Sequence, residues 1–302
     1  STFKPVTVAS ALEEGVVKDG DTYVCKGFET VADYKLKCHV FSTIGSHGSL
    51  TVEQALMNSC NPYMIHLALE MGNSRFAYYQ SLFGFGKITG IDLPGETTGI
   101  VYGDRMTTID AACNSFGQTI NVNMMQMMAA YCSIINGGML YQPHIVKRIE
   151  SANGEVVKEY KANLVRQTIT ASTSKLLRRY LKNTVEEGTA KKAGVTGYSV
   201  AGKTGTAQKG DRKDNKWIIS FIGHAPAENP KFAIYVVIDE PYGTTGTSGS
   251  SADVLTLTHN ILEKLLPYMN VYKDASDEYE DTSSSPDELT VDGIPAGTAS
   301  SN

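Results

Sequence analysis

Three apolar segments that follow one another closely constrain the fold of this chain more than any other feature. They are rich in β-branched and aromatic side chains, and a polar loop and a turn join them. They span residues 198–208, 217–225 and 232–238. Consecutive strands on short connections pair antiparallel. The sequence therefore predicts an antiparallel meander in its second half.

Segments with a helical spacing of apolar residues precede and follow these strands. The predicted helices span 1–15, 51–58, 62–71, 124–135, 172–187 and 252–268, with one more beginning at Asn73 or Ser74. Asn61 is the expected N-cap residue of its helix, and Pro62 takes the first helical position. Ser59 and Asn61 should then lie in the joint between two helices.

The composition indicates one globular domain followed by an acidic tail. Hydrophobic residues make up 41% of the 302 residues and charged residues 20%, enough for a full-sized core in residues 1–271. Residues 272–302 are rich in Ser, Asp and Glu and are expected to be disordered. The net charge of −5 comes mainly from this tail, so nothing predicts a nucleic-acid partner. No apolar run of about 18 residues occurs.

The spacing of cysteines and histidines predicts no metal site and no cofactor. Five cysteines occur without C-x-x-C spacing, and the six histidines form no H-E-x-x-H. The stretch 23–41, which contains Cys25 and Cys38, has alternating segments that predict a hairpin.

Three short motifs occur in a fixed order along the chain. They are Ser1-Thr2-Phe3-Lys4, Ser59-Cys60-Asn61 and Lys203-Thr204-Gly205-Thr206. Each motif alone is weak, because a short pattern with few fixed positions arises often by chance. The three in this order, on a helix, a helix joint and a strand, are a strong signal of nucleophilic catalysis.

The first motif pairs a nucleophile with a base. Residues three apart on a helix share one face, so the Lys4 amine can reach the Ser1 hydroxyl. A desolvated lysine beside another cation can be neutral enough to accept the serine proton. Lys203 is the expected second cation.

The other two motifs supply proton transfer and substrate contacts. Ser59 can pass a proton between Lys4 and the leaving group, and the Asn61 amide can hold a substrate carbonyl.

The strand motif suits a substrate with a free carboxylate. Lys203, Thr204 and Thr206 offer a positive charge and two hydroxyls, and Gly205 lets the backbone come close to the ligand. The backbone N–H groups of Thr206 and Ser1 are the expected oxyanion hole.

Each motif also has a purely structural interpretation. Ser1 can simply begin a helix, Ser59 and Asn61 can be caps, and Lys203 can lie at the exposed basic end of a strand. These interpretations leave the co-occurrence of the three motifs unexplained.

At these residues the sequence resembles the penicillin-binding protein and serine β-lactamase superfamily, and within it the class B transpeptidases. The likeness covers nearly everything from Ser1 to about Leu266. It extends to 84–86, 89–96, 115–118, 186–190, 201–208 and 220–223. The resemblance implies an α/β fold of the α+β type, in which helices flank an antiparallel sheet beside an all-helical subdomain. Because family members carry the first strands of that sheet before the nucleophile, we expect the sheet here to lack its N-terminal strands.

The resemblance further implies a DD-transpeptidase that cross-links peptidoglycan stem peptides through a serine acyl-enzyme and is inhibited by β-lactams. Ser1 is then the nucleophile and Lys4 the base. The implied partners are stem peptides, β-lactams and cell-wall synthesis proteins that bind the absent N-terminal region. The implied location is the extracytoplasmic face of the bacterial membrane, with an anchor in that region.

Several alternatives remain open at this point. A DD-carboxypeptidase, a β-lactam-sensing receptor domain and a β-lactamase share the motifs, although no convincing carboxylate for deacylation occurs. An N-terminal-nucleophile hydrolase would use the Ser1 amine as base, and an inactive fragment would fold only with its missing portion. Because the family works where disulfides can form, a bond between Cys25 and Cys38 is a further hypothesis.

Overall fold

A three-stranded antiparallel sheet forms the centre of the computed structural model, which describes residues 1–210, 216–241 and 250–274. Its strands are β9 (Ala201–Lys209), β10 (Lys216–Ala225) and β11 (Phe232–Asp239), in the order β11-β10-β9. The predicted meander is confirmed.

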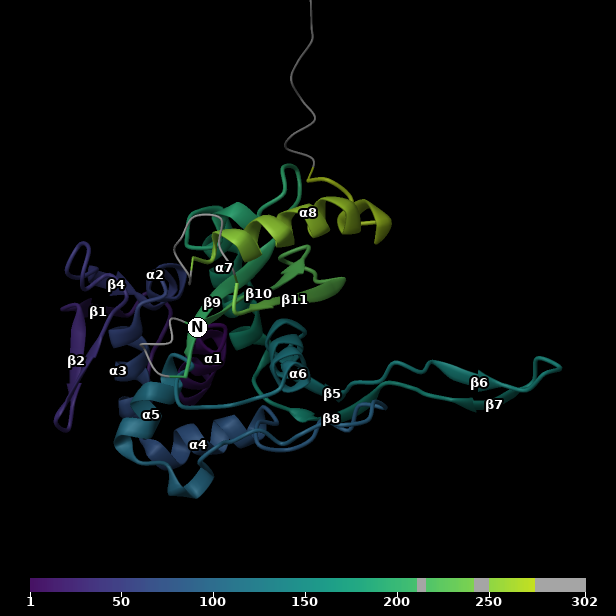
Figure 1. The fold of residues 1–302 in the computed structure, drawn as a ribbon, viewed down its shortest axis with the longest axis horizontal. Coiled ribbons are helices and arrows are strands. Elements are labelled where there is room, and N and C mark those ends of the chain that lie inside the picture. Colours follow the sequence, from purple (N-terminus) through teal and green to yellow (C-terminus); the bar gives the residue numbers. More distant parts are fainter. Residues whose placement is uncertain (211–215, 242–249, 275–302) are drawn as a thin grey trace, which may run out of the picture.

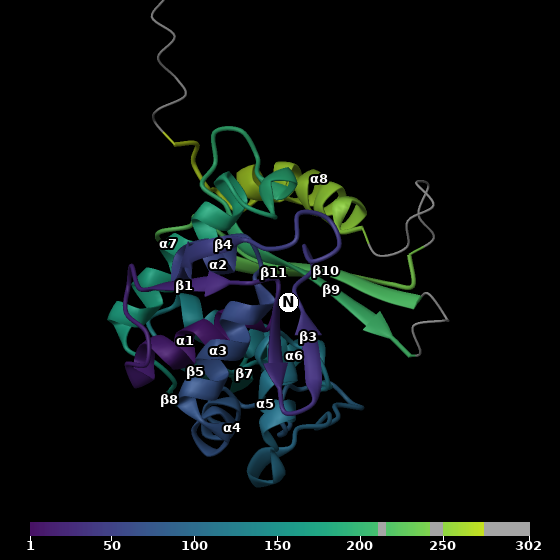
Figure 2. The same cartoon turned by 90° about the vertical axis from the view of Figure 1, so that its left-hand side faces the viewer.

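Helices cover both faces of this sheet (Figures 1 and 2). Helix α8 (Ala252–Tyr268) buries Leu255 and Leu262 against Ile219 and Phe221 of β10. Ile222 points to the opposite face and joins the larger core beneath the sheet, because side chains alternate along a strand. The expected α+β architecture is confirmed.

The larger core belongs to a helical lobe built around α1 (Lys4–Glu14). Helix α1 is enclosed by its neighbours, and it ends at Gly15, whose φ of 77° closes the last turn. The other helices are α2 (Val52–Met57), α3 (Asn61–Met71), α4 (Asn73–Leu82), α5 (Thr108–Ser115), α6 (Met124–Ile135) and α7 (Ala171–Glu186), with short 3₁₀ turns at Gly103–Arg105 and Lys191–Ala193. All the predicted helices are present, although α1 begins at Lys4, so Ser1 precedes the helix instead of lying on it. Helix α5 was not anticipated.

Four two-stranded pairings lie at the periphery of the helical lobe. They are β1 (Thr22–Cys25) with β4 (Gly48–Thr51), β2 (Phe28–Val31) with β3 (Tyr34–Lys37), β5 (Met139–Gln142) with β8 (Asn163–Gln167), and β6 (Arg148–Glu150) with β7 (Val156–Glu159). The β6–β7 hairpin projects away from the body of the molecule (Figure 1).

Two local predictions need correction. The hairpin predicted within 23–41 is limited to β2 and β3, because Cys25 ends β1, which pairs with the distant β4. Helix α3 begins at Asn61 itself, with Cys60 in the N-cap position, so Asn61 does not cap it. The Asn61 side chain instead bonds to the buried lysine of the first motif, Lys4.

The expected disordered tail falls largely on residues 275–302, outside the described part of the chain. Among the described residues, no helix has the length and apolar character needed to cross a membrane.

Candidate active site

Lys4 lies at the first turn of α1, and its side chain is fully buried. Its Nζ lies 2.6 Å from the Ser59 carbonyl oxygen, 2.9 Å from Ser59 Oγ and 2.8 Å from Asn61 Oδ1. The structure therefore brings the first and second motifs together through the lysine. Among the hydrogen bonds of the described residues, none joins Lys4 Nζ directly to the Ser1 hydroxyl.

Ser59 occupies the joint between α2 and α3 in an unusual backbone conformation. Its φ of 53° lies in the left-handed region, which non-glycine residues rarely adopt. In this conformation both its carbonyl oxygen and its hydroxyl face Lys4 Nζ. Such a conformation persists only where surrounding contacts hold it, and it is concentrated at functional sites.

Asn61 forms hydrogen bonds both to Lys4 and to the backbone at the end of β3. Its Oδ1 accepts the hydrogen bond from Lys4, and its Nδ2 donates to the Lys37 carbonyl oxygen at 3.3 Å. The position at the first turn of α3, immediately after Cys60, directs this amide into the site rather than onto the helix end.

The third motif lies on β9, on the other side of α1. Lys203 is fully buried, and its Nζ donates to the carbonyl oxygen and Oγ1 of Thr204 at 3.3 and 3.4 Å. Thr204 and Thr206 line the active-site groove, whereas Lys203 does not. Lys203 Nζ thus lies behind the groove wall, beside the Thr204 hydroxyl, and the expected role of Lys203 toward a carboxylate stays a prediction.

This open groove has a volume of about 780 Å³ and connects the motifs. Ser1, Ser59, Asn61, Thr204 and Thr206 line it together. Further lining comes from regions outside the three motifs, among them the end of β3, the segment after α5 and the segment after α7. Their lining residues include Lys37, His39, Gln118 and Thr189.

Gly205 permits a close approach between protein segments. A Cβ at this position would lie 2.4 Å from Ser220 Oγ and 2.9 Å from Thr2 Cγ2. The glycine is therefore required for β9 to pack against the residues that precede α1 and against β10. The atoms that a side chain at Gly205 would meet belong to the protein itself, and the expected close approach of a ligand at this glycine stays a prediction.

Burial changes the protonation of both motif lysines. It lowers the pKa of Lys4 to about 8, an effect that the charges of Cys60 and Cys38 partly oppose. Burial, and then the positive charge of Lys4, lower the pKa of Lys203 well below its usual value. Burial therefore favours the neutral form of both lysines, and the charge of Lys4 adds to this effect at Lys203.

The contacts of Lys4 fit a neutral amine as well as an ammonium ion. A neutral amine has two N–H groups, for the Ser59 carbonyl and the Asn61 Oδ1, and a lone pair that accepts the Ser59 hydroxyl proton. The arrangement can therefore receive a proton and return it through Ser59.

The hypothesised disulfide between Cys25 and Cys38 is not present, because all five cysteines are free thiols. The sequence analysis also overlooked Lys37, His39 and Thr189 as groove residues. Thr189 lies within the resembling segment 186–190, a signal that could have found it. Lys37 and His39 carry no such signal, because their place in the groove wall depends on how the β2–β3 hairpin packs against the rest of the protein.

Comparison with known proteins places the chain in a family. Residues 1–263 match the family model of the penicillin binding protein transpeptidase domain. The chain is 40% identical over 277 residues to Stage V sporulation protein D of Bacillus subtilis, covering 90% of this chain and 42% of that protein. It is 32% identical over 281 residues to the peptidoglycan D,D-transpeptidase FtsI of Escherichia coli, covering 91% of this chain and 44% of that protein.

Comparison with a solved structure supports the same family. Penicillin-binding protein 3 of Mycobacterium tuberculosis, complexed with aztreonam, superimposes with a TM-score of 0.81 at 28% identity, over 91% of this chain and 63% of that chain. The resemblance inferred from the three motifs is thereby confirmed, although the chain spans less than half the length of the two curated relatives. This chain belongs to the penicillin-binding protein transpeptidase domain family, in its class B group.

Proposed function

We propose that this domain is a serine D-alanyl-D-alanine transpeptidase that cross-links peptidoglycan stem peptides. The observation that carries the proposal is the bonding of buried Lys4 Nζ to both Ser59 and Asn61, at the floor of a groove that Ser1 lines. The FtsI relative is a peptidoglycan D,D-transpeptidase, which supports the same assignment.

In the first half-reaction, Ser1 Oγ attacks the carbonyl carbon between the two D-alanines. The serine proton passes to the neutral Lys4 amine, and the backbone N–H groups of Ser1 and Thr206 stabilise the oxyanion. The C–N bond then breaks, and Ser59 relays the proton from Lys4 to the departing D-alanine amine. An ester between the peptide and Ser1 remains.

In the second half-reaction, the amine of another stem peptide attacks this ester. The C–O bond to Ser1 breaks, the new amide forms, and the amine proton returns to Ser1 through the Lys4 and Ser59 pair. Water in place of the amine would give a carboxypeptidase, which has the same first step.

Substrate recognition follows from the groove lining. We assign Thr204 and Thr206 to the terminal carboxylate, with the Lys203 amine beside the Thr204 hydroxyl. One Asn61 N–H is engaged by the Lys37 carbonyl, which leaves the second for a substrate carbonyl. Aztreonam and ampicillin complexes of the Mycobacterium tuberculosis relative support β-lactams as inhibitors of this site.

The wider setting of the domain is part of the same proposal. Residues 1–271 form the transpeptidase domain, and residues 272–302 follow it as an acidic tail. The complete protein acts on the extracytoplasmic face of the bacterial membrane, where an upstream segment anchors it and binds other cell-wall synthesis proteins.

The test is product analysis with a stem-peptide mimic ending in D-Ala-D-Ala, offered together with an amine acceptor. We expect mass spectrometry to find the cross-linked amide and released D-alanine, and we expect both to disappear in Ser1→Ala. Asn61→Ala should reduce the rate about 100-fold or more, because it removes a support of Lys4 and a substrate contact. Hydrolysis alone, at every acceptor concentration, would reassign the domain as a carboxypeptidase.

A further inference from the structure

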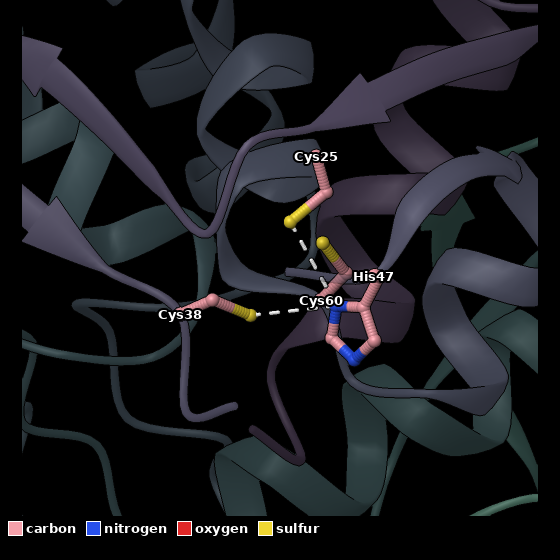
Figure 3. A group of neighbouring side chains, drawn as sticks. All are labelled: Cys25, Cys38, His47 and Cys60. Carbon is pink, nitrogen blue, oxygen red and sulfur yellow. Dashed lines mark hydrogen bonds between the residues drawn. The ribbon is translucent and has the colours of Figure 1, made fainter. Parts of the chain in front are cut away.

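Three cysteines and a histidine converge beside the active site, although they are scattered along the sequence. Cys25 ends β1, Cys38 follows β3, His47 precedes β4, and Cys60 lies between α2 and α3. Their sulfur and ring-nitrogen atoms all lie within 4.8 Å of one another. Figure 3 shows the side chains pointing toward a common centre.

The distances within this cluster match those of a tetrahedral metal site. His47 Nδ1 lies 3.8 Å from Cys25 Sγ and 3.6 Å from Cys38 Sγ. In a tetrahedral zinc site with Zn–S of about 2.3 Å and Zn–N of about 2.0 Å, neighbouring ligand atoms lie about 3.5 to 3.8 Å apart. The side chains are thus spaced for a shared ion, and none of the three sulfurs forms a disulfide.

The surroundings of the cluster favour a bound cation over simple thiol packing. Cys25, Cys38 and Cys60 are almost completely buried, at 1%, 3% and 0% exposure, while His47 is half-buried. The Gly27 N–H donates to Cys25 Sγ at 3.4 Å, a contact that stabilises a thiolate ligand. Four ligands from separate elements, with one N and three S atoms, form the donor set that zinc prefers.

We propose that Cys25, Cys38, His47 and Cys60 bind a structural Zn²⁺ ion. The protein supplies all four ligands, so the ion has no open position for water and takes no part in the chemistry. Binding requires deprotonated thiols and releases their protons. The sequence analysis excluded a metal on spacing alone, and these ligands follow none of the usual spacings because folding brings them together.

The ion would connect the groove wall to the second catalytic motif. Cys60 is the middle residue of that motif, between Ser59 and Asn61, which both bond Lys4 Nζ. Cys38 lies between Lys37 and His39, which line the groove. One ion therefore fixes the β2–β3 hairpin and the joint between α2 and α3 in a single position.

Hydrogen bonds already join the β2–β3 hairpin to the joint between α2 and α3, and the ion would reinforce them. The His39 Nε2 lies 2.9 Å from the Asn58 carbonyl oxygen, and Asn61 Nδ2 donates to the Lys37 carbonyl. We infer that zinc positions Ser59 and Asn61 for their contacts with Lys4. This consequence rests on the proposed function, whereas zinc binding itself does not.

Metal analysis of the complete chain, purified with a phosphine reductant, tests the proposal. We expect about one zinc ion per chain by elemental mass spectrometry. Replacement by Co²⁺ should give the intense visible bands of a tetrahedral thiolate site. Cys25→Ser and His47→Gln should lose the ion, whereas Cys132→Ser, a half-buried cysteine on α6 away from the cluster, should retain it.

Chelation of the wild-type chain avoids dependence on how the variants fold. Removing zinc should lower the unfolding temperature and slow penicillin acylation at least about tenfold, and added Zn²⁺ should restore both. Absence of stoichiometric zinc and of the cobalt spectrum in the wild type would overturn the proposal. So would a count of fewer than five thiols in the unreduced chain, because a disulfide would have consumed the ligands. A zinc-bound chain without acylation would instead contradict the proposed function alone.

Discussion

Lys4 is a fully buried amine whose three hydrogen bonds all go to the Ser59-Cys60-Asn61 motif. At the scale of single residues, its protonation decides whether Ser1 can be activated. The neutral form can accept a proton, whereas the ammonium form cannot. Burial lowers the pKa of Lys4, and the Cys60 and Cys38 sulfurs partly oppose this effect.

The pKa of Lys4, lowered to about 8 by burial, predicts a pH dependence. The acylation rate constant for penicillin should rise with pH and level off above about pH 8, because the base is the deprotonated form. The measurement is the rate of covalent labelling from about pH 6 to about pH 10. Lys4→Arg, which stays protonated, should be inactive throughout, and a rate that falls as pH rises through this range would contradict the role of Lys4.

At the scale of elements, the site depends on how closely β9 packs against the start of α1. We predict that Gly205→Ala destabilises this packing, because the added methyl group would overlap with Ser220 Oγ and Thr2 Cγ2. Acylation should slow about tenfold or more, and the free energy of unfolding should fall by about 1–3 kcal/mol.

The matched control is the double variant Gly205→Ala/Ser220→Ala, which removes the nearer of the two clashes. It should regain part of the stability and part of the acylation rate that Gly205→Ala loses. Kinetics and denaturant unfolding measure both. Wild-type stability and acylation in Gly205→Ala would contradict the claim that β9 packs too closely for a side chain at this position.

Sequence patterns predicted the elements better than the contacts between them. Helix 124–135 and helix 252–268 were predicted with the bounds of α6 and α8, since their apolar spacing and end signals are local. The pairing of β1 with β4 was missed, because it joins residues that are separated along the chain by the whole β2–β3 hairpin.

The same distinction applies to the site. The motif residues were found from sequence because each motif is a short local pattern. The burial of Lys203 beneath Thr204, the lining role of His39 and the meeting of His47 with three cysteines depend on tertiary contacts. No local pattern carries that information.

At the scale of the whole molecule, the folded domain ends with the segment after α8. Leu266 and Val271 are buried in the core beneath that helix, and the Asp274 N–H donates to the Gly197 carbonyl at 2.8 Å. The folded unit therefore extends beyond residue 263, where the family match ends.

Truncation tests the proposed domain boundary. A chain ending at residue 274 should unfold at the same temperature as the complete chain. A chain ending at residue 263 loses the buried Leu266 and Val271 and should be less stable by about 2–5 kcal/mol. Equal stability of the two truncated chains would place the boundary earlier than we propose.

The central claim is that Ser1 forms a long-lived acyl-enzyme, supported by the buried lysine and the second motif. Its most direct test is incubation with a fluorescent penicillin, followed by intact mass measurement over hours. The longer protein that includes the preceding region serves as a parallel sample, and Ser74→Ala, at an exposed serine on α4, is the matched control. We predict one persistent adduct on the wild type and on Ser74→Ala, and none on Ser1→Ala. An adduct that survives Ser1→Ala, or no adduct on either the chain or the longer protein, would contradict the account.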